Sequence, residues 1–373
     1  MTNILFLSHV SSLYGANRSM LDIIRNIDKD KFMIFVVIPD LGQIGVKLRE
    51  MKITYKVIPM SPTVHSKLDY EEVAKIEKNF KAIKQICGLI KEWNIDIVHT
   101  NSSVINLGAI AAKITNRKHV WHIRELDVQY NFKNDCKLLD SILLKKSDKV
   151  ICISNYVKKD LCKTVNYNNA IVFYNPIDSE KYDVVRNDIL TNPQINLLVC
   201  GVIIENKRQL VVVKAIKILL DKGYRNIKLT IVGDGGEYKK RIVKYVRDNH
   251  IEDYVEINSF CEDLTEYRRK ADIAVMSSVY EALGRVTIES MLNELVVIGA
   301  DSGATHELIR DNVNGLKYMP DSPEELAEKI EYAMENKEEM RKMVKQAKQF
   351  AMKNFDAKRK ILQLEKMYLK LFN

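Results

Sequence analysis

Two glutamates with seven residues between them lie where a strand should turn into a helix. Glu281 follows an apolar run at 273–276 that predicts a buried strand, and Gly284 precedes a predicted helix. Glu289 is then about one turn into that helix, whose first N–H groups lack intrahelical partners and favour anions. A carboxylate there can accept hydrogen bonds from a diol such as ribose, while the helix N-terminus binds phosphate. The alternative is an ordinary surface helix with an acidic first turn.

A second candidate phosphate contact lies near the start of the chain. Gly15 follows the first apolar run and directly precedes a predicted helix at 16–27. A glycine in that position lets backbone N–H groups approach a phosphate at the helix N-terminus. Since the segment is neither GxGxxG nor a Walker loop, a plain turn is the alternative interpretation.

The sequence gives little support for a metal site. Asp28-Lys29-Asp30 is a DxD pattern, but it falls in a charged turn where solvated aspartates are expected. His119 and His122 are three residues apart on a predicted strand, which places them on opposite faces. The six cysteines have no CxxC spacing, which favours reduced thiols buried as small apolar side chains. We therefore expect no bound metal and no cofactor.

Buried strands and amphipathic helices alternate from end to end, which predicts parallel sheets with crossover helices. In the long helix expected at 71–92, we place Val73, Ile76, Phe80, Ile83, Cys87 and Ile90 on the buried face. The predicted strands of the first half are 3–8, 32–38, 96–100, 119–123 and 149–153. Those of the second half are 195–200, 227–232, 255–257, 273–276 and 296–298, and the pattern is helical from residue 323 onward.

These patterns predict an α/β protein with two doubly wound Rossmann-like domains facing a cleft. The first domain should span 1–175 and the second 195–353, with a linker at 176–194. The last segment, 354–373, should form a helix that returns to the first domain. In such folds, ligands bind beyond the carboxyl ends of the strands, at topological switch points.

Composition narrows the class of protein and its partners. The 373 residues are 46% hydrophobic and 29% charged, a balance typical of soluble domains, and no apolar stretch approaches the roughly 20 residues that span a bilayer. The start of the chain lacks the features of a signal peptide, so we expect a cytoplasmic protein. Residues 1–175 contain 26 Lys and Arg against 17 Asp and Glu, whereas the remainder contains 32 of each.

The basic first half, with five lysines on the helix at 71–92, has three possible partners: nucleic acid, an anionic membrane or an acidic substrate. No basic cluster is interleaved with aromatic residues, which argues against nucleic acid. The lysines of the 71–92 helix either form a solvated face or contact anionic lipid at the inner face of the membrane. These lysines are Lys75, Lys78, Lys81, Lys84 and Lys91.

The block at 277–319 resembles the signature of the retaining glycosyltransferases of family 4 (group 1), which have the GT-B fold. Other motifs agree with that family in order and spacing, so the resemblance covers nearly the whole chain. The glutamate pair in the signature block is the specific part of the match. The supporting motifs are 14–16 (YGA), 120–125 (VWHIRE), 174–178 (YNPID), 200–201 (CG) followed by 207–209 (KRQ), and 232–236 (VGDGG).

The resemblance implies roles for the residues of the signature block. Glu289 should bind the ribose hydroxyls of a nucleotide sugar, and Glu281 should contact the donor sugar in its transition state. The backbone of Leu283, Gly284 and Arg285 should hold sugar or phosphate.

Further roles follow from the other motifs. Lys207 should neutralise the diphosphate of the leaving nucleotide, and Gly15 should let the first loop approach the same diphosphate. His122 should face the sugar from the acceptor side and help to orient it. Val202 stands where the family usually has arginine, and Arg208 or Arg285 would have to supply the missing cation.

The chemistry that the resemblance implies is the retaining transfer of a sugar from a UDP- or GDP-linked donor to a glycan or lipid-linked acceptor. A fixed cation and helix N-termini stabilise the leaving diphosphate without a metal. Retention would follow from front-face attack, with the leaving phosphate taking the acceptor proton, unlike the paired-carboxylate scheme of glycosidases. We expect a role in cell-surface polysaccharide or glycoconjugate synthesis. The alternatives are a nucleotide-sugar 2-epimerase of the same fold and a non-catalytic glycosyltransferase-like subunit.

Overall fold

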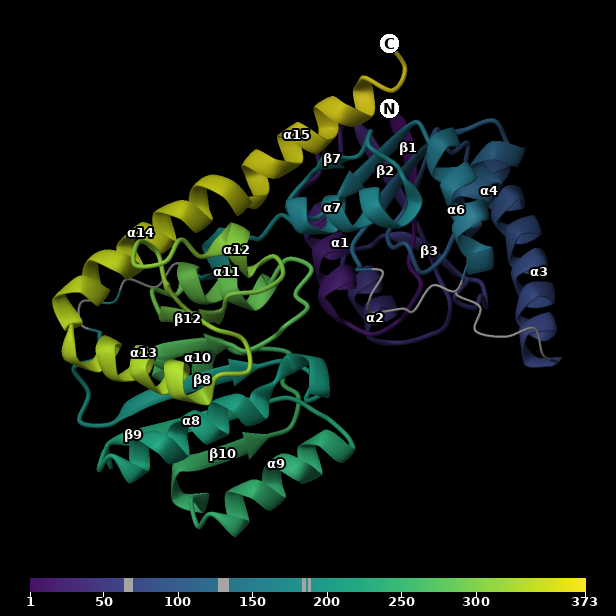
Figure 1. Cartoon of the computed structure of the whole chain (residues 1–373). Helices are drawn as coiled ribbons and strands as arrows, with labels where there is room; N and C mark the ends of the chain where they lie inside the picture. Colours follow the sequence, from purple (N-terminus) through teal and green to yellow (C-terminus); the bar gives the residue numbers. More distant parts are fainter. Residues whose placement is uncertain (64–69, 127–133, 183–185, 187–188) are drawn as a thin grey trace. The chain divides into compact units, whose positions relative to one another are not determined.

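The computed structural model describes residues 1–63, 70–126, 134–182, 186 and 189–373 (Figure 1). It divides the chain into two compact units, and each is described by itself. Unit 1 comprises Met1–Ile177 and Ala357–Asn373, and unit 2 comprises Asp178–Asp356. Five residues of the predicted linker, 183–185 and 187–188, lie outside the described residues.

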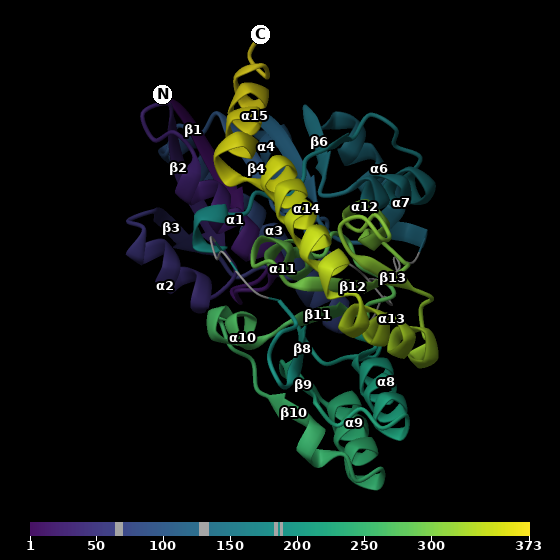
Figure 2. The same cartoon turned by 90° about the vertical axis from the view of Figure 1, so that its left-hand side faces the viewer.

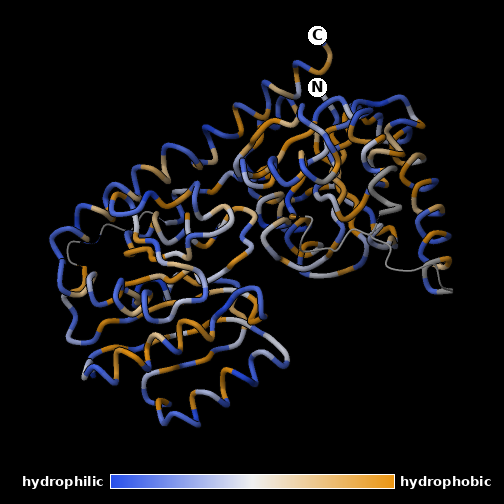
Figure 3. Tube along the Cα trace, in the orientation of Figure 1, coloured by the Kyte–Doolittle hydropathy of each residue, from blue (hydrophilic) through white to orange (hydrophobic). Residues whose placement is uncertain are grey.

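Unit 1 is built on a parallel sheet of seven described strands in the order β3-β2-β1-β4-β5-β6-β7. The strand order reverses between β1 and β4, which makes this pair the switch point of a doubly wound sheet. The side chains of β1, β2, β4, β5 and β6 are mostly buried, because crossover helices cover both faces. Figure 3 shows the hydrophobic stretches of the chain in orange. The strands are β1 (Thr2–Leu7), β2 (Phe32–Ile38), β3 (Thr54–Val57), β4 (Ile97–Thr100), β5 (Lys118–Ile123), β6 (Lys149–Cys152) and β7 (Ile171–Val172).

The helices of unit 1 connect these strands. α7 shows a well-defined start, where the Ser154 hydroxyl accepts a hydrogen bond from the backbone N–H of Val157 at 3.0 Å and satisfies one of the helix's free donors. The helices are α1 (Gly15–Asn26), α2 (Gln43–Glu50), α3 (Tyr70–Glu92), α4 (Leu107–Ile114), α6 (Asn134–Lys146) and α7 (Asn155–Val165).

The buried face of α3 differs from the face that we predicted. Ile83, Cys87 and Ile90 do pack inward, with Ala82 and Ile86. The expectation for Val73, Ile76 and Phe80 is wrong: they are 57%, 39% and 72% exposed. The buried side chains of α3 begin at Asn79, toward its C-terminal half, so the apolar side chains of the first half remain at the surface of unit 1.

Unit 2 repeats the architecture with a parallel sheet of six described strands in the order β10-β9-β8-β11-β12-β13. Here the strand order reverses between β8 and β11. The two doubly wound α/β domains predicted from the sequence are therefore confirmed. The strands are β8 (Ile195–Cys200), β9 (Ile227–Val232), β10 (Val255–Asn258), β11 (Ile273–Met276), β12 (Val296–Ala300) and β13 (Leu316–Tyr318).

Short turns and helices follow each strand of unit 2. The last two helices of unit 2, α13 and α14, lie at the start of the segment from residue 323 onward where the sequence pattern is helical. The helices are η1 (Ser179–Tyr182), η2 (Glu205–Lys207), α8 (Gln209–Asp221), α9 (Glu237–Asp248), η3 (Glu252–Tyr254), α10 (Thr265–Lys270), α11 (Arg285–Leu292), α12 (Thr305–Leu308), α13 (Pro323–Glu335) and α14 (Lys337–Phe355).

The chain passes from unit 1 to unit 2 and later returns. Within the predicted linker at 176–194, Ile189 and Leu190 are buried in the core of unit 2. The return ends in α15 (Ala357–Leu369), which belongs to unit 1 and packs on α1 (Figures 1 and 2). α15 buries Ile361 and Tyr368 in the core of unit 1, so this core is completed by the last residues of the chain.

Candidate active site

Lys207 and Glu281 lie at the switch point of unit 2. Lys207 belongs to the loop that follows β8, and Glu281 to the loop that follows β11. The Lys207 Nζ donates to Glu281 Oε2 at 2.6 Å, and the two side chains are 32% and 24% exposed. A partly exposed ion pair at a switch point, where α/β folds bind their ligands, can exchange its internal partner for a ligand.

Backbone contacts between neighbouring loops fix the position of Lys207. The Ser277 hydroxyl donates to the Lys207 carbonyl at 2.6 Å, and the Val279 N–H donates to the Asn206 carbonyl at 3.2 Å. The same loop is held from its other side, where the Ile203 N–H donates to the Asp234 carbonyl at 2.7 Å. The loops after β8, β9 and β11 therefore hold one another.

The loop after β12 fixes Glu281 in the same way. The Ala304 N–H donates to the Glu281 carbonyl at 2.8 Å. Gly303 has a φ of +55°, and a Cβ there would lie 2.8 Å from both the N and the O of Glu281. Only glycine permits this approach together with this φ. The Gly303-Ala304 pair thus sets the backbone from which the Glu281 side chain projects.

The N-terminus of α11 follows Glu281 directly. Gly284 caps the helix with a φ of +92°, and Leu283 before it is buried at 3% exposure. Arg285 is the first helical residue. The first N–H groups of a helix carry partial positive charge and lack intrahelical partners. The structure therefore places Leu283, Gly284 and Arg285 at a helix start beside the Lys207–Glu281 pair.

Glu289 is fully buried within α11 and surrounded by polar groups of unit 2. Its Oε1 accepts from Arg285 Nε at 2.7 Å and from the Tyr182 hydroxyl at 3.1 Å. Its Oε2 pairs with Arg268, whose side chain is 3% exposed. Both carboxylate oxygens thus have partners inside the protein, and the side chain is fully buried. The contact with ribose stays a prediction.

Sequence reasoning missed Arg268 and Tyr182 as partners of Glu289. Arg268 lies in α10 within a basic run, and Tyr182 lies just after the crossing between the units. The Arg268 guanidinium also lies 5.4 Å from the centre of the Tyr182 ring. Arg268 and Tyr182 are far from Glu289 along the chain, and no motif spacing connects them to it. The sequence therefore carried no signal for these contacts.

Both arginines proposed as substitutes for the cation absent at Val202 have carboxylate partners. Arg208 pairs with Glu205 at 2.9 Å and with Asp321 at 2.8 Å, and Arg285 pairs with Glu289. The sequence suggested no partner for either side chain. Lys207 is thus the cation that the structure places directly beside Glu281.

The unit 1 candidates lie in different surroundings. Gly15 is exposed at the first position of α1, and the loop before it is held by Asn17, whose Nδ2 donates to the carbonyl oxygens of Val10 and Ser12 at 2.8 Å each. His122 is fully buried on β5. Burial and the nearby Arg124 guanidinium hold the pKa of His122 well below its usual value, so its ring is neutral. Its sugar-facing role stays a prediction.

No group of His, Cys, Asp and Glu able to hold a metal ion occurs among the described residues. His119 instead bonds to Thr100 at 2.9 Å and to Ser147 at 2.8 Å, and burial lowers its pKa to about 3. Asp28 of the DxD pattern pairs with Lys31 at 2.5 Å in an exposed turn. These polar side chains fit structural roles.

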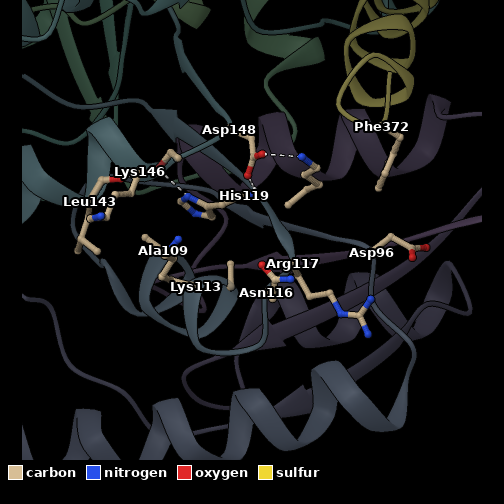
Figure 4. Close-up of a pocket in the computed structure, with 13 residues that line it drawn as sticks. Asp96, Ala109, Lys113, Asn116, Arg117, His119, Leu143, Lys146, Asp148 and Phe372 are labelled. Atoms are coloured by element: carbon tan, nitrogen blue, oxygen red, sulfur yellow. Dashed lines mark hydrogen bonds and ion pairs between the residues drawn. The ribbon is translucent and has the colours of Figure 1, made fainter.

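A hollow of about 340 Å³ occurs in unit 1 (Figure 4). It is lined by Lys113, Arg117, Lys146 and Asp148 among others, at the amino ends of β5 and β6. Ligands of doubly wound sheets bind at the opposite, carboxyl ends. Lys113 and Lys146 lie in the last turns of α4 and α6, where a positive charge is stabilised by the helix dipole. We therefore do not assign the active site to this hollow.

Comparison with known proteins identifies the two halves of the chain. A family model described as Glycosyltransferase Family 4 matches residues 14–181, and one described as Glycosyl transferases group 1 matches residues 183–350. The capsular polysaccharide biosynthesis glycosyltransferase CapH of Staphylococcus aureus is 23% identical over 322 residues, which are 84% of this chain and 83% of CapH.

A Campylobacter jejuni relative is a lipid-linked-oligosaccharide enzyme by name, the GalNAc-α-(1->4)-GalNAc-α-(1->3)-diNAcBac-PP-undecaprenol α-1,4-N-acetyl-D-galactosaminyltransferase. It is 26% identical over 299 residues, which are 75% of this chain and 76% of the relative. Among solved structures, Anabaena HepE in complex with UDP-glucose aligns with a TM-score of 0.84 at 21% identity, over 99% of this chain and 100% of HepE. This likeness shows the GT-B fold. From the two family matches, which together span most of its length, the chain belongs to the family 4, group 1 glycosyltransferases.

Proposed function

We propose that this glycosyltransferase moves a sugar, with retention of anomeric configuration and without a metal, from a UDP- or GDP-linked donor to a glycan or lipid-linked acceptor. The observation that carries the proposal is the Lys207–Glu281 pair, 2.6 Å apart, beside the N-terminus of α11 at a switch point. Cleavage of a glycosyl–phosphate bond leaves negative charge on the diphosphate. A fixed ammonium and free helix N–H groups are suited to stabilise that charge.

In this proposal, Glu281 has two successive roles. Without donor its carboxylate holds Lys207 in place. When a diphosphate binds Lys207, the carboxylate becomes available to the positively charged sugar of the transition state. Gly303 and Ala304 keep its backbone fixed during the exchange, so little reorganisation is required.

Names among the relatives support a donor and an acceptor of these classes. The HepE structure was solved with UDP-glucose, and the Campylobacter relative is named for an undecaprenyl-diphosphate-linked acceptor. CapH is named for capsular polysaccharide synthesis. We infer that this chain also acts in the synthesis of a cell-surface polysaccharide or glycoconjugate.

A lipid-linked acceptor would bring the enzyme to the cytoplasmic face of a membrane. None of the described helices has the length and apolar character needed to cross a bilayer. The exposed Val73, Ile76 and Phe80 of α3, beside the exposed Lys78 and Lys84, suit contact with an anionic lipid surface. We propose this half of α3 as the peripheral contact.

The test begins with thermal unfolding of the full chain in the presence of individual nucleotide sugars. A donor at 100 times its dissociation constant stabilises the fold by about 2.7 kcal/mol. The stabilising donor is then incubated with acceptor lipids, and the anomeric coupling of the product is read by NMR. An α product from an α-linked donor supports the proposal, and a β product contradicts the retaining mechanism.

The same assay separates the alternatives. Conversion of the donor to its 2-epimer in the absence of acceptor would identify an epimerase. Donor binding with neither transfer nor hydrolysis would identify a non-catalytic subunit.

A further inference from the structure

Four buried side chains of unit 1 form a continuous network of hydrogen bonds that meets at Nδ1 of His122. The Tyr368 hydroxyl of α15 lies 2.7 Å from His99 Nδ1, and His99 Nε2 lies 3.3 Å from His122 Nδ1. Arg124 Nη2 lies 3.2 Å from the same His122 Nδ1. Tyr368, His99 and His122 are fully buried, and Arg124 is 4% exposed.

Arg124 determines which atom donates and which atom accepts in each hydrogen bond of this network. A guanidinium can only donate, so His122 Nδ1 must accept. His99 Nε2 faces that same acceptor and therefore must donate to it. Burial lowers the pKa of both histidines well below the usual value, so each ring is neutral and carries one proton. His99 Nδ1 then accepts, and the Tyr368 hydroxyl donates.

This order leaves the proton of His122 on Nε2. That atom is buried and has no hydrogen-bond partner among the described residues. A buried N–H without an acceptor is unfavourable and rare in native proteins. The network thus holds an N–H donor ready, and its acceptor must come from outside the described side chains.

The Arg124 end of the network is itself fixed. Arg124 Nε donates to Asn101 Oδ1 at 3.0 Å, and Arg124 Nη1 donates to Asn175 Oδ1 at 2.5 Å. Asn101 follows β4, next to the switch point of unit 1, and Arg124 directly follows β5. The polar chain therefore runs from the C-terminal helix to the carboxyl ends of the strands, where ligands of this fold bind.

We propose that Tyr368 and His99 are positioning residues that hold His122 in the neutral tautomer protonated at Nε2, so that it donates a hydrogen bond to an oxygen of the sugar substrate. The inference rests on the proposed function for the identity of the ligand, but not for the tautomer. It assigns His122 an orienting role and excludes a general-base role, because a ring nitrogen that carries a proton cannot accept one from the acceptor hydroxyl.

The first test is long-range ¹H–¹⁵N NMR on the full chain labelled at its seven histidines, with His122→Asn and His99→Asn to assign the signals. We expect both rings to be neutral at pH 7 with the proton on Nε2. A proton on Nδ1 of either ring, or a charged ring, would overturn the inference even if the enzyme transfers sugar as proposed.

The second test removes the Tyr368 hydroxyl, which is the outermost donor of the hydrogen-bond network. In Tyr368→Phe, His99 Nδ1 loses its hydrogen bond, so the His99 ring should populate both tautomers and the His122 signal should shift. We expect kcat to fall about fivefold to tenfold, the range of one lost hydrogen bond, with KM for the donor nearly unchanged. Unaltered ¹⁵N signals in this variant would refute the positioning role.

Tyr318→Phe is the matched control. Tyr318 is 1% exposed in unit 2, and its hydroxyl has no hydrogen-bond partner among the described residues. Its loss should leave both the histidine signals and kcat unchanged. If Tyr318→Phe lowers kcat as much as Tyr368→Phe, the effect reflects general packing and the positioning role is wrong. If no variant, wild type included, transfers sugar, the NMR result still tests the tautomer.

Discussion

The two units share one topology but place their polar side chains differently. Unit 1 buries His99, His119 and His122 in or beside its sheet. Unit 2 leaves Lys207 and Glu281 partly exposed on loops at its switch point. A shared strand order thus fixes where a ligand can bind, whereas the loops decide whether charge is available to meet it.

The two most deeply buried candidates also differ. Glu289 has partners at both carboxylate oxygens, and two of these partners are arginines. His122 has partners at Nδ1, but its Nε2 is without one among the described residues. Removal of the Glu289 carboxylate should therefore affect stability first, whereas a ligand can still add a contact to His122.

The largest effect expected is the loss of stability in Glu289→Ala. Two arginines, Arg268 and Arg285, would lose their carboxylate in a buried site, and breaking a buried pair costs about 3–5 kcal/mol. Denaturant unfolding measures this directly. The control is Glu281→Ala, which breaks a partly exposed pair worth about 1 kcal/mol or less. Equal losses of unfolding free energy in the two variants would show that burial does not distinguish these two carboxylates.

The milder Glu289→Gln tests the role in binding. If Glu289 contacts ribose equally in the ground and transition states, KM for the donor rises while kcat changes little. A large fall in kcat at constant KM would instead place Glu289 in the chemical step.

The next largest effect is on turnover in Lys207→Ala. The variant loses the cation beside the leaving diphosphate, and one such electrostatic contact is worth about 10²–10³ in rate. Stability should change little, because the side chain is 32% exposed. Arg208→Ala is the control, since Arg208 pairs with Glu205 and Asp321. Near-wild-type turnover in Lys207→Ala would contradict the role of Lys207 in stabilising the leaving diphosphate.

Acid should destabilise unit 1 before unit 2. The folded pKa of His119 is about 3, and those of His99 and His122 lie well below the usual value, chiefly because burial disfavours the charged ring. The unfolded chain takes up protons near pH 6.5 and the folded chain does not. This stability is therefore complete above pH 6.5 and declines as the pH falls toward 3. For His119 the loss at pH 5 is about 2 kcal/mol.

Hydrogen exchange at pH 7 and pH 5, corrected for the intrinsic rate, measures this decline for each unit. The histidines of unit 2, His250 and His306, are exposed, so unit 2 serves as an internal control. Equal loss of protection in both units would contradict the assignment of acid sensitivity to the buried histidines.

A smaller effect is expected on membrane association. Phe80→Ser removes the most exposed apolar side chain of α3, and loss of one buried aromatic contact of about 1.5–3 kcal/mol should weaken binding to anionic vesicles at least tenfold. Phe260→Ser, an exposed phenylalanine of unit 2 at 43%, is the matched control. Salt at about 0.5 M should release the wild type. Equal affinity for neutral and anionic vesicles would show that the lysines are merely solvated.

Chelation should produce no effect at all. Lys207 and the N-terminus of α11 can stabilise the diphosphate electrostatically, so EDTA should leave the transfer rate unchanged. Loss of activity that Mn²⁺ restores would replace this mechanism with a metal-dependent one.

Much of the architecture could be predicted from local patterns. Apolar runs located the central strands of both sheets, and the turn at Gly284 located the start of α11, because strand burial and helix starts depend on neighbouring residues. Strands β3, β7 and β13 were not predicted. They are edge strands of two to four residues, and their apolar content is too small to distinguish them from loops.

The sequence by itself determined the two-domain α/β organisation and the placement of Glu281 and Glu289 at a strand–turn–helix, because periodicity and spacing are properties of the chain. Lys207 was indicated by the resemblance to family 4. Tertiary structure alone decided that Arg268 and Tyr182 bind Glu289 and that Tyr368 reaches His99 across 269 residues. It also decided that Val73, Ile76 and Phe80 stay exposed. Burial and hydrogen-bond partners depend on which segments meet in space, and no spacing along the chain encodes those meetings.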